Sequence, residues 1–348
     1  MSNDELLRWG IIGCGAIGPK HARFLERMPK VSVVAAADND PEALERMCTR
    51  FGLKGYLDFQ AMILHEHLDV VSVCTPSGLH HDMAIWALQH GCHVLVEKPM
   101  AINVPACDAM ITAQRETGKI LSVVHQHRYD AASIQAKELM KSNALGTVSL
   151  GDAQVKWYRS THYYQRNGGW RGTWAMDGGG VLMNQAIHAI DLLTWLMGPV
   201  ASVRAYSDHR FHAIEAEDSA VAAIKFQSGA LGVVEGTTVA YPGVTTRLEI
   251  VGSRGSLRIE DDALDYLYTA QPSDNMGDYG KRQPSLPALS LPLVGFAAQL
   301  QDLVDSIVQQ RPPEVTAEEA RQPVKVIRAI YLAAQTGKEV TLECDARR

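Results

Sequence analysis

The chain has 348 residues, of which 46% are hydrophobic and 21% are charged. This length exceeds what one hydrophobic core usually supports, so it predicts two domains. The formal net charge of -6 argues against a nucleic-acid partner, because phosphate binding needs concentrated Lys and Arg.

The sequence also gives expectations about the compartment. No apolar run reaches the length of a membrane span, and the first residues, MSNDELLRWGIIG, lack a signal-peptide pattern. The six cysteines are scattered, without a Cys-x-x-Cys pair. This usage is typical of reduced, structural thiols. We therefore expect a cytoplasmic protein without a membrane partner.

The first element is a short apolar run that ends in Gly13-x-Gly15-x-x-Gly18 and leads into an amphipathic segment. A β-rich run follows and ends at Asp38, twenty residues after Gly18. This order predicts a dinucleotide-binding fold in which Gly13 allows a tight turn and Gly15 lets backbone approach a pyrophosphate. Gly18 lets helix and strand pack closely, and the predicted cofactor contacts in this turn include Ala16 and Ile17.

Asp38 indicates which dinucleotide binds. Its carboxylate is suited to accept hydrogen bonds from the ribose hydroxyls and to repel a 2′-phosphate. No Arg or Lys follows directly, since the next residues are Asn39, Asp40 and Pro41. The sequence therefore favours NAD over NADP, with Asn39 as a neighbouring contact.

Strands and helices alternate through residues 1–124, which predicts a Rossmann domain built on a doubly wound, mostly parallel sheet. Ligands of such sheets bind beyond the carboxyl ends of the strands. Two segments fall there, TPSGLH at 75–80 and EKP at 97–99. These ends supply further predicted cofactor contacts: Thr75, Pro76, Ser77, His80, Glu97, Lys98 and, after the next predicted strand, Gln126.

Residues 125–348 show a different pattern. Several runs alternate apolar and polar residues with little helix between them, which predicts a large, mainly antiparallel open sheet. One face of it would be covered by helices and the other left for solvent or for oligomer contacts. The segment 273–292 is rich in Gly, Pro and Ser and predicts a loop. Two helices are predicted near 294–310 and 317–336, and the sequence leaves open that they pack back near the first domain.

One segment of this part places polar residues together. Residues 181–197 predict a helix ended by Gly198-Pro199, with Asn184, His188 and Asp191 at i, i+4 and i+7 on one face. A histidine there is either a structural residue oriented by Asp191 or a proton acceptor. With Lys98 at a predicted ligand edge, the second interpretation gains, because a polyol dehydrogenase needs a base and a cation that polarises the forming carbonyl.

The glycine turn, TPSGLH, EKP and GGG…MNQAIHAIDLLTWL resemble the glucose–fructose oxidoreductase and inositol dehydrogenase (Gfo/Idh/MocA) family over nearly the whole chain. The resemblance implies a Rossmann domain, a C-terminal α/β domain and homodimers or homotetramers through its sheet. It implies that Lys98 contacts the substrate hydroxyl and the nicotinamide, that His188 is the acid/base residue and that Glu97 lies by the nicotinamide ribose. It also makes a cis bond between Lys98 and Pro99 plausible.

Asn184 stands where inositol dehydrogenases of the family have an aspartate, which weakens an inositol assignment. The motifs GWRGTW and MNQ resemble the branch that oxidises UDP-N-acetylglucosaminuronate at C3. Arg171 suits a carboxylate or phosphate, whereas Tyr163, Tyr164, Trp170 and Trp174 are equally suited to stacking on sugar and to packing. The predicted substrate contacts are Lys98, His127, Arg128, Tyr164, Trp170, Arg171, Asn184 and His188.

We therefore expect an NAD(H)-dependent oxidoreductase that oxidises a secondary hydroxyl of a sugar, nucleotide sugar or cyclitol. The alternatives are an inositol dehydrogenase, a keto-sugar reductase and, in a different class, a non-catalytic dinucleotide-binding regulator. No metal is predicted, because His125, His127, His209 and His212 lack a convergent Cys or carboxylate at ligand spacing.

Overall fold

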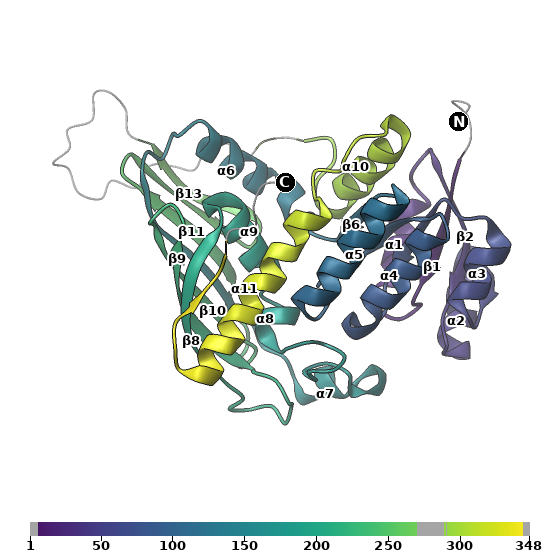
Figure 1. The fold of residues 1–348 in the computed structure, drawn as a ribbon, viewed down its shortest axis with the longest axis horizontal. Helices are drawn as coiled ribbons and strands as arrows, with labels where there is room; N and C mark the ends of the chain where they lie inside the picture. The colour runs from purple at the N-terminus through teal and green to yellow at the C-terminus, as the bar shows by residue number, and fades with distance from the viewer. Residues whose placement is uncertain (1–5, 270–288, 290, 344–348) are drawn as a thin grey trace. The chain divides into compact units, whose positions relative to one another are not determined.

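The computed structural model describes residues 6–269, 289 and 291–343. The chain divides into two compact units (Figure 1). Unit 1 comprises Met1–His125, Ala175–Gly178 and Phe296–Val324, and unit 2 comprises Gln126–Trp174, Gly179–Gly295 and Lys325–Arg348. Residues 296–324, from the C-terminal third of the chain, thus belong to unit 1.

Unit 1 contains a fully parallel sheet in the order β3-β2-β1-β4-β5-β6, which confirms the predicted doubly wound fold. Its strands are β1 (Leu7–Ile12), β2 (Val31–Ala37), β3 (Lys54–Tyr56), β4 (Val70–Val73), β5 (His93–Val96) and β6 (Leu121–Val123). Because β1 lies between β2 and β4, the chain reverses its direction of travel across the sheet there, which is where such folds bind ligands.

The helices of this unit begin where the sequence provides caps. Asp40, Asp58 and Asn103 each accept a backbone N–H at the start of a helix. The helices are α1 (Gly18–Leu25), α2 (Pro41–Phe51), α3 (Phe59–Glu66), η1 (Ser77–Leu79), α4 (His80–Gln89), α5 (Val104–Thr117) and α10 (Gly295–Gln309, from Phe296 on). Helix α11 (Ala317–Thr336) begins in unit 1 and ends in unit 2.

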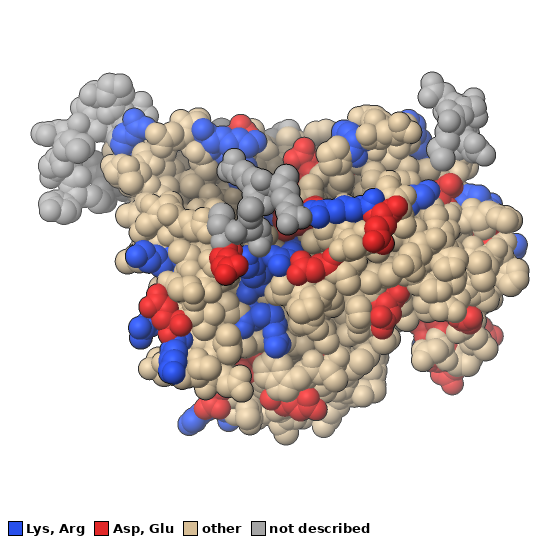
Figure 2. Space-filling view, viewed as in Figure 1, with Lys and Arg blue, Asp and Glu red and all other residues tan. Residues whose placement is uncertain are grey.

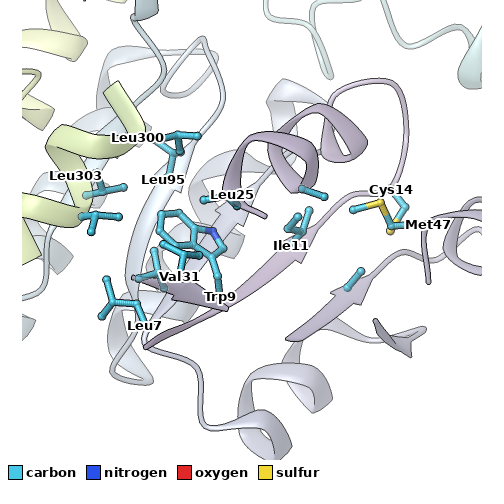
Figure 3. Packing of buried hydrophobic residues seen from close by; sticks show 14 of the residues in the cluster. Leu7, Trp9, Ile11, Cys14, Leu25, Val31, Met47, Leu95, Leu300 and Leu303 are labelled. Atoms are coloured by element: carbon cyan, nitrogen blue, oxygen red, sulfur yellow. The ribbon is translucent and has the colours of Figure 1, made fainter. Parts of the chain in front are cut away.

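The two faces of the sheet bury different residues of β1. Trp9 is fully buried and packs in one cluster with Leu300 and Leu303 of α10 (Figure 3). On the opposite face, a Cβ added at Gly10 would lie 2.4 Å from Leu68 Cδ1, so that face has no room for a side chain there. Successive residues of β1 therefore face the helix layers on opposite sides of the sheet, and α10 completes the core on the side of Trp9.

Unit 2 contains a sheet in the order β13-β12-β11-β7-β10-β9-β8-β14. Among the strand pairs that the structure describes in this sheet, only β7 and β10 are parallel, so the predicted mainly antiparallel sheet is confirmed. Its strands are β7 (Val148–Lys156), β8 (Val200–Asp208), β9 (Ser219–Phe226), β10 (Leu231–Thr237), β11 (Thr246–Gly252), β12 (Gly255–Glu260), β13 (Ala263–Thr269) and β14 (Val340–Thr341).

One face of this sheet carries helices. Helix α9 (Ile187–Met197) packs on β7 and β11, and α8 (Val181–Asn184) packs on β9 and β10. The other helices are η2 (Gln126–Tyr129), α6 (Ala131–Lys141), α7 (Thr161–Gln165) and η3 (Asn167–Gly169). Along β9, buried and exposed residues alternate, so the opposite face reaches solvent in this chain.

The single helix predicted over 181–197 is wrong in one respect, because it is broken into α8 and α9. The N–H of Ala186 donates to the carbonyl of Val181, five residues back, at 2.8 Å, which is a wide turn. Leu182, Ile190 and Leu193 are buried as expected. The break shifts Asn184 relative to His188 from where a continuous helix would place it.

The predicted loop at 273–292 lies almost wholly outside the described residues. Among the residues that the structure describes, no helix is both long and apolar enough to cross a membrane. Acidic and basic side chains are interspersed on the face shown in Figure 2, as the modest net charge leads one to expect.

Candidate functional site

The glycine turn of unit 1 is constrained at both ends. Gly13 has φ of +100°, and a Cβ there would lie 2.7 Å from the carbonyl of Cys74. A Cβ on Gly18 would lie 2.1 Å from the Gly13 oxygen. By contrast, a Cβ on Gly15 would meet nothing within 4 Å, so Gly15 leaves an open approach to backbone where a pyrophosphate would bind.

The start of α1 is also suited to an anion. Its N-cap residue is Ile17, which provides no side-chain cap, so the first N–H groups are not satisfied by a side chain there. Gly15 and Ala16 are exposed just before it. Pro19 has no N–H and the N–H of Lys20 donates to the Ile17 carbonyl at 2.8 Å, so the backbone of the turn before them, with the positive end of the helix dipole, is the part suited to an anion.

Asp38 lies directly after β2, where a ribose would be bound. Its Oδ2 accepts the N–H of Cys14 at 2.6 Å, and its Oδ1 accepts the N–H of Asp40 at 2.9 Å. These bonds hold the carboxylate beside the glycine turn, with Asn39 exposed next to it. The position fits recognition of ribose hydroxyls.

The residues after β4 divide into two roles. Oγ1 of Thr75 is buried without a hydrogen-bond partner among the described residues, which suits a donor or acceptor from a cofactor. Pro76 and Ser77 follow at η1. His80 is buried, with Nδ1 2.8 Å from the carbonyl oxygen of Pro99 and Nε2 3.0 Å from that of Thr75. We therefore assign His80 to bracing these two loops.

The EKP segment follows β5 directly. Lys98 is half-buried, and its bond to Pro99 is cis. Glu97 Oε1 lies 3.0 Å from Nε2 of the buried His21, and its Oε2 accepts the N–H of Lys98 at 3.2 Å. Burial alone would raise the pKa of Glu97, but its interactions with His21 and Lys98 outweigh burial and lower that pKa. Together these residues fit an NAD-type dinucleotide.

In unit 2, a buried ion pair fixes the start of the unit to helix α9. Arg128 donates from Nε to Asp191 Oδ2 at 2.8 Å and from Nη2 to Oδ1 at 2.7 Å. Its neighbours in η2 are Gln126 and His127. Asp191, expected as a possible orienting residue for His188, thus makes a two-point contact with Arg128.

His127 lies between acidic groups and His188. Its Nδ1 is 2.8 Å from Asp130 and 2.9 Å from Asp262. Burial alone would lower the pKa of His127, but the hydrogen bonds and charges of the two carboxylates raise it to about 9. The ring centroid lies 4.8 Å from that of His188, edge to face. The structure therefore brings the predicted residues His127 and His188 together.

His127, Asp130 and Asp262 resemble a set of metal ligands, since one potential ligand atom from each lies within 4.8 Å of the others. One nitrogen, Nδ1, faces both carboxylates, and this arrangement equally suits a protonated imidazole shared by two anions. The raised pKa of His127 follows from that arrangement.

Asn184 joins the aromatic segment that precedes it. Its Oδ1 accepts the hydroxyl of Tyr163 at 3.1 Å. The guanidinium of Arg171 lies 4.9 Å from the Tyr163 ring centroid and 4.7 Å from that of Trp170. Tyr164 is buried and its hydroxyl bonds to Thr238 at 2.9 Å, so its side chain is a packing residue in this unit.

Several residues around these sites were not predicted. Asp130 and Asp262 hold His127, and Glu217 binds the N–H groups of Gly180 and Leu182 at the start of α8, both at 2.9 Å. Burial raises the pKa of Glu217 to about 7 against these hydrogen bonds. Asp130 had a local signal, three residues after His127, whereas Asp262 and Glu217 depend on the fold.

Comparison with known proteins finds the same organisation. A family model described as "Oxidoreductase family, NAD-binding Rossmann fold" matches residues 7–125, and "GFO/IDH/MocA C-terminal domain" matches residues 133–258. The WlbA dehydrogenase from Bordetella pertussis, solved with NADH and UDP-GlcNAcA, is 31% identical with a TM-score of 0.88, and the match covers 98% of this chain and all of that one.

Curated relatives are similar over different lengths. A myo-inositol 2-dehydrogenase from Thermotoga maritima is 25% identical over 97% of this chain and 99% of its own length. A D-glucoside 3-dehydrogenase from Escherichia coli is 30% identical over 61% of this chain and 60% of its own length. The similarity thus includes enzymes named for a cyclitol and for a glucoside, and a dehydrogenase whose solved complex contains a nucleotide sugar.

The glycine turn gives a matched pair of variants. Gly18→Ala should reduce the free energy of unfolding by roughly 1–3 kcal/mol, because its Cβ overlaps the Gly13 carbonyl. Gly15→Ala should change the unfolding free energy little and weaken NADH binding, because its Cβ enters the open approach. Urea unfolding and fluorescence titration with NADH measure both. Equal losses of stability in the two variants would contradict this description of the turn.

The acidic partners of His127 give a pH prediction. The raised pKa of His127 contributes stability that is present below its unfolded pKa, near 6.5, and is lost as pH rises to about 9. Asp262→Asn should lower the His127 pKa and flatten the decline of unfolding free energy across that range. NMR titration of the ring checks it, with Asp208→Asn on the exposed surface as control. An unchanged His127 pKa in Asp262→Asn would contradict the assignment.

Proposed function

Because this chain belongs to the GFO/IDH/MocA family of oxidoreductases with an NAD-binding Rossmann fold, we propose that it oxidises a secondary hydroxyl of a sugar-like substrate. The observation that carries the proposal is the full-length similarity to the WlbA dehydrogenase, whose complex contains NADH and UDP-GlcNAcA. Among sugars, nucleotide sugars and cyclitols, that similarity favours a nucleotide sugar. Asn184 supports this preference over inositol, because the inositol dehydrogenases that the chain resembles have an aspartate at this position.

In this proposal His188 and Lys98 have distinct roles. Bound NAD would supply the hydride acceptor. His188 accepts the hydroxyl proton, while the ammonium of Lys98 donates a hydrogen bond to the oxygen that becomes a carbonyl. His127, with a pKa of about 9, places a positive charge beside the ring of His188, 4.8 Å away between ring centroids.

The cofactor is proposed to be NAD. The Asp38 carboxylate is held beside the glycine turn by the N–H groups of Cys14 and Asp40. A 2′-phosphate there would face this carboxylate, and the next residue, Asn39, adds no positive charge. The proposed contacts are Gly13, Gly15, Ala16, Ile17, Gly18, Asp38, Asn39, Thr75, Pro76, Ser77, Glu97, Lys98 and Gln126, with His80 as their support.

We also propose that the chain forms homodimers or homotetramers through the exposed face of the unit 2 sheet. On that face Tyr206 pairs with Val221, and their side chains are 85% and 54% exposed. Leu231 pairs with Leu150, and their side chains are 55% and 37% exposed. Apolar side chains gathered on one face are typical of a contact between subunits.

The function is tested by Lys98→Ala. The kcat for oxidation of UDP-N-acetylglucosaminuronate should fall by about 100-fold or more, while the dissociation constant of NADH changes by less than about threefold. Absorbance of NADH measures turnover, and Lys30→Ala, exposed before β2, is the control. Undiminished turnover by Lys98→Ala, or none by the wild type across nucleotide sugars, hexoses and cyclitols, would refute the proposal.

Cofactor choice is tested by Asp38→Ala. The ratio of kcat/KM for NAD to that for NADP should fall by about tenfold or more, because the carboxylate no longer repels the 2′-phosphate or binds the ribose. Asp58→Ala, at the start of α3, is a matched loss of a carboxylate elsewhere in unit 1. A wild type that prefers NADP would contradict the assignment.

The oligomer is tested by Val221→Glu. A charge on the exposed face, opposite Tyr206, should shift the chain to monomers in light scattering after size exclusion. The control is Val244→Glu, because Val244 is 66% exposed in the segment between β10 and β11. A wild type that is already monomeric at micromolar concentration would contradict the proposed contact.

A further inference from the structure

Three arginines of unit 2 surround one aromatic ring. The guanidinium carbons of Arg159, Arg166 and Arg171 lie 5.2, 5.7 and 4.9 Å from the ring centroid of Tyr163. They come from one stretch of chain, after β7, after α7 and after η3. A turn at Gly168 and Gly169, both with positive φ, folds this stretch so that the three cations meet.

These cations are not neutralised by the part of the protein that the structure describes. None of the three forms an ion pair with a described Asp or Glu, unlike Arg128 with Asp191. Nε of Arg159 and Nη1 of Arg171 are buried and have no hydrogen-bond partner among residues 6–269, 289 and 291–343. Like charges close together and unsatisfied buried donors are both unfavourable, and an anion would relieve both.

The arginine cluster is connected to the helix pair that carries His188. The Tyr163 hydroxyl donates to Asn184 Oδ1 at 3.1 Å and accepts from Nε2 of Gln185 at 3.1 Å. Asn184 is the last residue of α8, and His188 is the second residue of α9. An anionic group bound by the arginines would therefore lie next to Tyr163, and Tyr163 contacts the break between α8 and α9, close to His188 along the chain.

We propose that Arg159, Arg166 and Arg171 form a binding site for an anionic group of the substrate, so that the oxidised sugar carries a carboxylate or a phosphoryl group. This inference rests on the proposed function and restricts its substrate class to anionic sugars. The planar, forked guanidinium suits oxyanions, and two or three of them exclude a neutral sugar from the same position by leaving their charges unpaired. Arg171 and the buried nitrogen of Arg159 supply the stronger contacts, while Arg166 is exposed.

The test compares two ligands that share a diphosphate and differ at C6 of the sugar. Calorimetry with the NADH-bound protein measures the affinity for UDP-N-acetylglucosaminuronate and for UDP-N-acetylglucosamine. Arg171→Gln should weaken binding of the uronate by about tenfold or more, Arg159→Gln similarly, and Arg166→Gln less because it is exposed. Arg171→Lys should recover only part of the loss, since it keeps the charge without the fork.

The pattern identifies the source of the anion. Loss for the uronate alone assigns the site to the carboxylate, and equal loss for both ligands assigns it to the diphosphate. Arg50→Gln is the control, because Arg50 also lies over one ring, 5.1 Å from the centroid of Phe51, in unit 1. Unchanged affinity in all three variants, or no binding of either ligand by the wild type, would overturn the inference.

The same measurement separates this inference from the proposed function. Calorimetry reports binding without turnover, so arginine-dependent binding with no hydride transfer would refute the dehydrogenase and leave the anion site. Oxidation of neutral sugars, with a kcat/KM that Arg171→Gln does not change, would refute the anion site and leave the proposed dehydrogenase. Thermal unfolding of each variant shows whether a loss of affinity comes from a loss of fold.

Discussion

The ion pair between Arg128 and Asp191 is the constraint on which the arrangement in unit 2 depends. Both side chains are buried, and two hydrogen bonds of 2.8 and 2.7 Å join them. Removing one partner from such a pair typically costs about 3–5 kcal/mol, because the other charge is left buried. By holding η2 against α9, the pair sets the neighbour His127 edge to face with His188.

A second constraint fixes the start of the same helical segment. A Cβ on Gly180 would lie 1.8 Å from the Glu217 carbonyl oxygen, so only glycine fits there. The Glu217 carboxylate binds two N–H groups of that segment and the hydroxyl of Tyr331 at 2.9 Å. The wide turn that follows then presents Asn184 to Tyr163. Backbone packing at one end and an ion pair at the other thus define the polar surface between them.

The nucleotide-binding unit was predictable because its signals are local. The glycine turn, Asp38 and the alternating strands lie in chain order, and each sets its own geometry. The unpredicted features join distant residues: Arg128 meets Asp191 63 positions later, and His127 meets Asp262 from the β12–β13 turn, where Asp261 and Asp262 have positive φ. The break after Asn184 also lacked a signal, because apolar spacing across 181–197 suits one continuous helix.

We propose that the Arg128–Asp191 pair positions His127 and His188 for catalysis. The most direct measurement is the kcat of an Arg128→Met/Asp191→Leu double variant that has regained the unfolding free energy lost by either single variant. We predict that this folded variant has a kcat lowered by about tenfold or more, because the two imidazoles are no longer aligned. A wild-type kcat in that variant would show that the ion pair supports the fold alone, and would contradict the account.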